Sequence, residues 1–147
     1  MKERTISERS WPRVDVTLTF FSESLAPQEM VAIAQVEPDF ATPAFLTQWG
    51  ARVARPSAMY GLSASGEDTE DTSSVIEQLM WRVGDSRRGF VALGERADVT
   101  ILSVAFYLTG EHREAPGLTI SGPCVRLLVS LGADVQLAVY RNDELQV

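Results

Sequence analysis

Hydrophobic and polar residues alternate in several stretches of the chain, and this pattern predicts strands of a sheet. Val14–Phe21 and Val135–Tyr140 place an apolar side chain at every second residue, as expected for strands with one buried face. Val99–Leu108 is apolar on both faces, which is typical of a central strand. Ala58–Ser63 is a plausible short strand, so the pattern predicts a sheet of about four strands.

Helical periodicity appears between these strands. Thr72–Val83 carries one apolar stripe, and Arg87–Arg96 reads as a second short helix that two internal glycines weaken. Two further helices begin at prolines, one over Pro27–Val36 and one over Ser121–Gly132, where serine is a capping residue and glycine a natural end. The elements therefore alternate between strands and helices.

This order predicts an α+β fold built from two strand-helix-strand units joined by a helix pair. Right-handed crossovers would place the helices mainly on one face of the sheet, ferredoxin-like in flavour. We expect residues 1–13 to be a flexible N-terminal arm, residues 14–140 to form one domain, and residues 141–147 to be a tail. Residues 38–57 show no readable period and are interpreted as a long loop.

Charge restricts the function classes. The chain of 147 residues has 13 basic and 20 acidic residues and a net charge of −7; because residues 1–13 carry +2, the remainder carries −9. Such an acidic body repels phosphate backbones, so we expect no nucleic-acid partner. Lys2 is the only lysine, which excludes P-loop and Schiff-base lysines from the body.

The distribution of apolar residues and the cysteine count indicate the compartment. No run approaches the ~18 apolar residues of a membrane span, and the N-terminus lacks the apolar core of a signal peptide. Cys124 is the only cysteine, so no intramolecular disulfide forms, and this fits a reducing compartment. The sequence thus predicts a cytoplasmic protein without membrane contact.

Catalytic chemistry has little support in the sequence. Ser63 lies in a near miss to the G-x-S-x-G elbow, and the one available base, His112, is distant in sequence. Cys124 follows a helix start, where a reactive thiol competes with the favoured reading of a small buried residue. His112 lies between Glu111 and Arg113 in a charged loop, which makes these three residues candidate ligand-binding groups. We expect no metal, no cofactor and no enzymatic activity.

Two other features are candidates for partner binding. One is an acidic run ahead of the 72–83 helix, interpreted either as a solvated turn or as a surface for a basic partner. Its members are Glu67, Asp68, Glu70 and Asp71. The other is Trp49, which with the neighbouring Phe40 and Phe45 either covers the core or forms a hot spot.

The two proline-started helices and their flanking strands resemble a bacterial family, the domain of unknown function family 4279. The resemblance covers about residues 14–140 and is carried by the strands at Val14–Phe21 and Val99–Val104 and the strand end at Leu131–Tyr140. It implies an α+β fold and a bacterial origin, and it supplies no catalytic residues. The chain departs from the family at Met59–Gly61, where a tryptophan-bearing strand is usual, and at Ala26, where an acidic cap is common.

Three functional hypotheses follow. The first is a non-enzymatic binding protein that recognises a basic protein, in the manner of an immunity-type inhibitor of a toxin. The alternative is a small-molecule sensor or enzyme with a pocket between the 38–57 and 109–117 loops. The third is self-association through an exposed edge strand. The sequence leaves the oligomeric state open.

Overall fold

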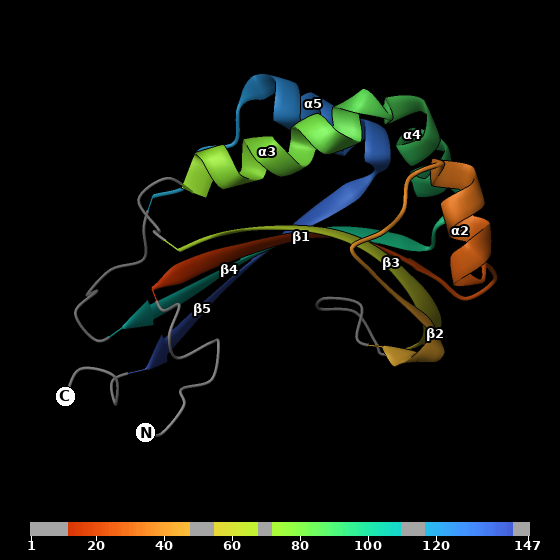
Figure 1. The fold of residues 1–147 in the computed structure, drawn as a ribbon, viewed down its shortest axis with the longest axis horizontal. Coiled ribbons are helices and arrows are strands. Elements are labelled where there is room, and N and C mark those ends of the chain that lie inside the picture. The colour runs from red at the N-terminus through yellow and green to blue at the C-terminus, as the bar shows by residue number, and fades with distance from the viewer. Residues whose placement is uncertain (1–11, 48–54, 68–71, 110–116, 143–147) are drawn as a thin grey trace.

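The described part of the chain folds into five strands and four helices (Figure 1). The computed structural model describes residues 12–47, 55–67, 72–109 and 117–142. The strands are β1 (Arg13–Ser22), β2 (Phe40–Thr47), β3 (Arg55–Gly66), β4 (Val99–Thr109) and β5 (Ala133–Asn142). The helices are α2 (Pro27–Ala34), α3 (Thr72–Asp85), α4 (Arg87–Arg96) and α5 (Gly122–Leu131).

The five strands form one mixed sheet in the order β2-β3-β1-β4-β5. β1 pairs antiparallel with both β3 and β4, and β2 pairs antiparallel with β3. β5 pairs with β4 in parallel. The second predicted strand-helix-strand unit, β4-α5-β5, is therefore a parallel crossover. The first was predicted to end in Ala58–Ser63, which lies in β3 and pairs antiparallel with β1. The parallel crossover in this half is instead β1-α2-β2, because β3 lies between β1 and β2 and runs antiparallel to both. The α+β class predicted from the sequence is confirmed.

All four helices cover one face of the sheet, and the core lies between the two layers (Figure 1). The alternating residues of β1 supply the centre of this core: Val14, Val16, Leu18 and Phe20 are each 0% exposed. Phe20 packs against Tyr60 and Phe90 at ring-centroid distances of 6.0 Å. These aromatic contacts join the sheet to α4.

The sheet has five strands rather than about four, because β2 forms inside the segment interpreted as a loop. Pro43 interrupts the alternation of β2, and the pairing register with β3 shifts between Thr42 and Phe45. β3 also extends beyond the predicted Ala58–Ser63 at both ends. The ferredoxin-like flavour is not confirmed, since the fifth position of the sheet holds β5 in parallel with β4.

The two glycines of α4 allow close helix packing. A Cβ atom at Gly89 would overlap the backbone carbonyl of Ala34 in α2. A Cβ atom at Gly94 would lie 2.6 Å from the carbonyl oxygen of Leu131 in α5. The residues that weakened the helix prediction therefore let α4 fit between α2 and α5.

Helix α5 begins and ends as the sequence predicted. The Oγ atom of Ser121 accepts a hydrogen bond from the backbone N–H of Cys124 at 3.4 Å. Gly132 ends the helix with a φ of 66°, in the left-handed region that glycine adopts without a Cβ penalty. This cap fixes Cys124 on the inner side of the first turn of α5.

Candidate functional site

A groove of about 540 Å³ lies between α3 and α5, on the outer side of the helix layer. Its lining comes from α3, from the start of α4 and from the first half of α5. The lining residues are Glu77, Met80, Trp81, Gly84, Asp85, Arg87, Ser121, Pro123, Cys124 and Leu127. We call this feature the α3–α5 groove.

The floor of the α3–α5 groove is apolar. Met80 is 2% exposed, and Cys124 and Leu127 are each 6% exposed. Met80 belongs to the buried stripe of α3, and the other two belong to the buried side of α5. The floor is therefore formed by residues of the hydrophobic core, at the place where α3 and α5 meet. The thiol of Cys124 packs there as a small apolar group, in agreement with the favoured sequence interpretation.

Trp81 is the one exposed large hydrophobic residue in the lining of the groove. Its side chain is 71% exposed, although a tryptophan normally buries most of its large apolar surface. Helical geometry explains the exposure, because residue 81 is turned about 100° from Met80 and so leaves the buried stripe. An exposed indole beside an apolar floor is the kind of anchor that protein interfaces favour.

Charged groups surround this apolar surface. Glu77 and Asp85 contribute carboxylates from α3. Arg87 adds one guanidinium, whose Nη2 donates a hydrogen bond to Ser130 Oγ at 2.9 Å. The groove thus combines an apolar floor, an exposed indole and an acidic border on the α3 side.

The opposite flank of α3 is held to the sheet by an ion pair. Arg82 donates to both carboxylate oxygens of Asp39, at 2.8 and 3.1 Å, and to the carbonyl of Ser63 at 3.1 Å. Asp39 also accepts the backbone N–H of Ser63 at 2.7 Å. The hydrogen bond from Arg82 holds the pKa of Asp39 below its usual value. Since Arg82 fixes one flank of the helix, Trp81 is left on the flank that faces α5.

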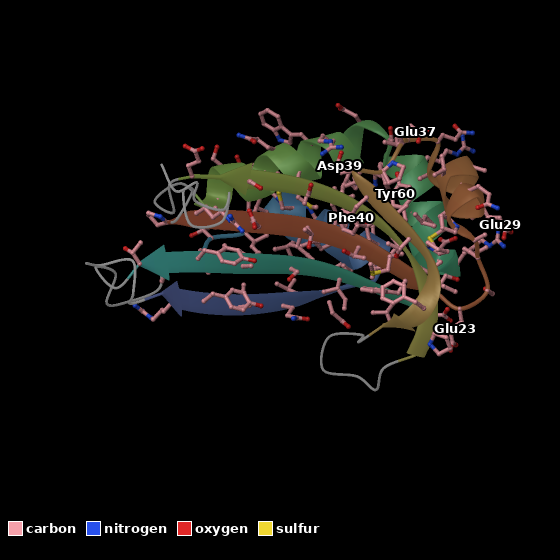
Figure 2. The ribbon with its side chains drawn as sticks, turned by 60° about the horizontal axis from the view of Figure 1, so that its bottom comes forward. Glu23, Glu29, Glu37, Asp39, Phe40 and Tyr60 are labelled. Atoms are coloured by element: carbon pink, nitrogen blue, oxygen red, sulfur yellow. The ribbon has the colours of Figure 1, made fainter. Side chains whose placement is uncertain are left out.

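A buried tyrosine fixes the neighbouring part of the sheet. Tyr60 is 0% exposed and its hydroxyl donates to the backbone carbonyl of Val36 at 2.6 Å. Burial, and secondly the charge of Glu37, raise the pKa of Tyr60 to about 12. Figure 2 shows Tyr60, Glu37 and Asp39 at the same end of the molecule, beside α2 and β2. These contacts tie the α2–β2 connection to β3 and give this end a structural role.

The site residues predicted from sequence lie elsewhere. Glu67 is exposed just beyond the end of β3 and does not line the α3–α5 groove. The other candidates lie outside the described residues, so the structure does not place them. They are Trp49, Asp68, Glu70, Asp71, Glu111, His112 and Arg113.

Sequence reasoning missed Trp81, although a signal for it exists. The apolar stripe of α3 accounts for Val75, Ile76, Leu79, Met80 and Val83, all buried. A tryptophan that falls outside such a stripe is predicted to face solvent. The groove itself had no sequence signal, because it depends on how α5 packs beside α3.

The described residues were also compared with the requirements of a metal-binding site and of a membrane-spanning helix. Within residues 12–47, 55–67, 72–109 and 117–142, no three His, Cys, Asp or Glu side chains gather closely enough to hold a metal ion. Among the helices of those same ranges, none has the length and apolar character needed to cross a membrane.

Comparison with known proteins gives one match. No curated protein and no solved structure matches the chain. The family model described as "Domain of unknown function (DUF4279)" matches residues 12–142, which include every strand and helix of the sheet and its covering layer. This range also contains the motifs on which the sequence resemblance rests. The chain therefore belongs to the DUF4279 family.

Proposed function

We propose that this protein is a non-enzymatic binding protein that recognises another protein through the α3–α5 groove. The observation that carries the proposal is the 71% exposure of Trp81 beside a floor of buried apolar residues. Leaving an indole in water costs free energy that burial against a partner recovers, and tryptophan is enriched among interface hot spots.

A basic partner fits the charges best. The chain has a net charge of −7, and Glu77 and Asp85 lie on the border of the groove. A partner segment with an apolar side chain for the floor and a flanking Arg or Lys for these carboxylates would match both features. Opposite charges of this kind increase association rates at low salt. An immunity-type inhibitor of a basic toxin is one protein of this description.

The chemistry of the groove favours binding over catalysis. Its one nucleophilic thiol is the buried side chain of Cys124. A thiol nucleophile needs an adjacent base to take its proton, and the groove lining contains no imidazole. The one guanidinium of the lining, that of Arg87, donates a hydrogen bond to Ser130 Oγ. Recognition, which needs shape and charge alone, demands less of these residues than turnover does.

Selection from a phage-displayed peptide library against the folded protein tests this proposal. We expect the selected peptides to pair an aromatic or aliphatic residue with Arg or Lys, and to lose at least about tenfold in affinity for Trp81→Ala, or about 1.4 kcal/mol. The matched control is Val129→Ala, because Val129 is 74% exposed on α5 and does not line the groove.

The contribution of the acidic residues to partner binding is tested separately, through the association rate. Replacing Glu77 and Asp85 by Gln and Asn should lower the association rate of the selected peptides at low salt and leave it nearly unchanged at high salt. Peptides that bind Trp81→Ala as tightly as the wild type contradict the groove as the binding site. A library that yields no binder contradicts the proposal as a whole.

A small-molecule ligand is the second candidate, and the size of the groove favours it. Small-molecule sites commonly enclose about 300–1,000 Å³, and the groove measures about 540 Å³. This hypothesis therefore moves from the predicted 38–57 and 109–117 segments to the space between α3 and α5. A metabolite panel scored by melting temperature tests it, since a ligand at 100 times its Kd adds about 2.7 kcal/mol. A shift that Trp81→Ala abolishes would favour this candidate.

A further inference from the structure

The edge strand β5 carries an apolar row on the helix side of the sheet that the helices leave uncovered. Val135, Leu137 and Val139 pair in register with the buried Leu102, Val104 and Phe106 of β4, so all six side chains point toward the helix layer. The β4 members are at most 2% exposed, whereas the β5 members are 47%, 56% and 47% exposed. The helix layer therefore ends before it reaches β5.

Helix α5 adds two more exposed side chains to the same edge. Val125 and Val129 are one turn apart and are 45% and 74% exposed. Pro123 and Leu127 face the α3–α5 groove, and successive residues of a helix turn by about 100°, so the two valines fall on the opposite flank. That flank faces away from α3, and α5 leads through Gly132 directly into the edge strand β5.

These five aliphatic residues form one surface, which we call the β5 edge surface. They make up most of the large hydrophobic side chains that are exposed in the described part of the chain. Monomeric proteins seldom leave so many apolar side chains in one continuous patch. They also seldom leave a ten-residue edge strand without protection by proline, bulge or lysine, and β5 has none of these.

We propose that a second copy of this chain covers the β5 edge surface, with the two β5 strands paired antiparallel about a two-fold axis. The axis stands perpendicular to the sheet, so both helix layers lie on the same side of a continuous ten-stranded sheet. In the register centred on Leu137, this residue opposes its own copy and Val135 opposes Val139 of the second copy. All three apolar residues then meet apolar partners, and a shift by two residues loses one of these pairs.

The sequence of β5 is symmetric about Leu137, with a valine two residues away on each side. Antiparallel pairing about this residue therefore places each apolar side chain of one strand opposite an apolar side chain of the other on the same face of the sheet. The surface is thus complementary to itself, as a two-fold interface requires. A second copy also brings the exposed flanks of the two α5 helices toward the axis.

Sedimentation of the full chain gives the first test. We expect wild type at twice the chain mass of 16.2 kDa. We expect Leu137→Glu at the monomer mass, because the two carboxylates would face each other across the axis. Trp81→Glu, which places the same charge on an exposed residue outside this surface, should stay dimeric. A monomeric wild type overturns the proposal, and so does a dimer that Leu137→Glu leaves intact.

Cysteine crosslinking gives the second test, and it does not depend on the charged variant folding. In a Cys124→Ala background, Leu137→Cys should form an intermolecular disulfide on mild oxidation, since directly opposed strand residues meet the Cα separation that a disulfide needs. Val135→Cys and Val139→Cys should each crosslink poorly alone and efficiently when mixed. Equal crosslinking of all three single variants, or none from Leu137→Cys, overturns the antiparallel register. The groove peptides serve as a separate check, because their binding to each crosslinking variant should equal their binding to the Cys124→Ala protein that these variants share.

Discussion

The guanidinium of Arg82 in α3 donates two hydrogen bonds to the carboxylate of Asp39, at 2.8 and 3.1 Å. Residue 39 immediately precedes β2, so this pair connects the edge of the sheet to the helix layer. The backbone N–H and carbonyl of Ser63 in β3 complete the contact. One ion pair therefore fixes the helix that carries Trp81 against two strands.

Replacing Asp39 by Asn should lower the free energy of unfolding by about 1 kcal/mol at neutral pH, since both side chains are partly exposed and the pair is screened by water. The pKa of Asp39 is lowered in the folded protein. Its contribution is therefore complete above the ordinary pKa of 3.8 and is lost as the pH falls further. Urea unfolding near pH 7 and near pH 3 should show the difference between wild type and variant shrinking in acid. Asp85→Asn is the control, and it should change stability little at either pH.

Tyr60→Phe should destabilise the protein by roughly 1 kcal/mol, because the carbonyl of Val36 would lose its buried hydrogen-bond donor. The alkaline side gives a sharper test. Tyr60 has a folded pKa of about 12 against 10.0 ordinarily, so its contribution is complete below pH 10.0 and is lost as the pH rises toward 12. The slope from this one group is about 1.4 kcal/mol per pH unit.

Wild type should thus lose stability over this alkaline range more steeply than Tyr60→Phe does. Denaturant unfolding at successive pH values measures the slope directly. Tyr140→Phe is the matched control, because Tyr140 is 50% exposed and should leave the wild-type slope unchanged. If stability falls with pH equally steeply in wild type and in Tyr60→Phe, the raised pKa of Tyr60 does not contribute to the alkaline loss of stability.

The same substitution at two helical glycines should have opposite effects. Gly94→Ala places a methyl group 2.6 Å from the carbonyl oxygen of Leu131, so we expect a loss of about 1–3 kcal/mol from overpacking. At Gly84 in α3, no atom lies within 4 Å of the position that a methyl group would take, and Gly84→Ala should add up to about 1 kcal/mol from helix propensity. A melting temperature that rises in Gly94→Ala as it does in Gly84→Ala would show that α4 and α5 are not in close contact at Gly94.

Much of this architecture could be predicted from the sequence, because local patterns control it. The stripe of α3, the serine cap of α5 and the alternation in β1 are each visible within one turn or a few strand residues. The sequence predictions that were wrong or weak concern features that depend on contacts between residues distant in sequence. Pro43 interrupts the alternating pattern of β2, so this strand was not predicted. It becomes evident only from its pairing with β3. Gly89 and Gly94 looked like helix breakers because the backbones that approach them, at Ala34 and Leu131, are far away in sequence.

The candidate sites show the same limit more strongly. Charged runs and loop aromatics are easily recognised in a sequence, so the hypothesis of a partner-binding surface was based on Glu67 and its neighbours. The α3–α5 groove is made by two helices that are distant in sequence, and the β5 edge surface by the place where the helix layer stops. Neither feature has a signature within a single segment.

The cap of α5 gives a prediction about the thiol in the groove floor. Ser121→Ala removes the side-chain acceptor of the Cys124 N–H and should cost about 1 kcal/mol of unfolding free energy, as for other helix N-caps. The first turn of α5 should then open more often, and the rate at which a thiol reagent labels Cys124 in the folded protein should rise about fivefold, since 1 kcal/mol in a local opening equilibrium has that effect. Ser130→Ala is the control, because Ser130 lies in the last turn of the same helix, where its hydroxyl donates to the Arg126 carbonyl at 3.0 Å. It should leave the labelling rate near that of wild type. A labelling rate in Ser121→Ala equal to the wild-type rate would mean that the side chain of Ser121 does not hold the first turn of α5 closed over Cys124.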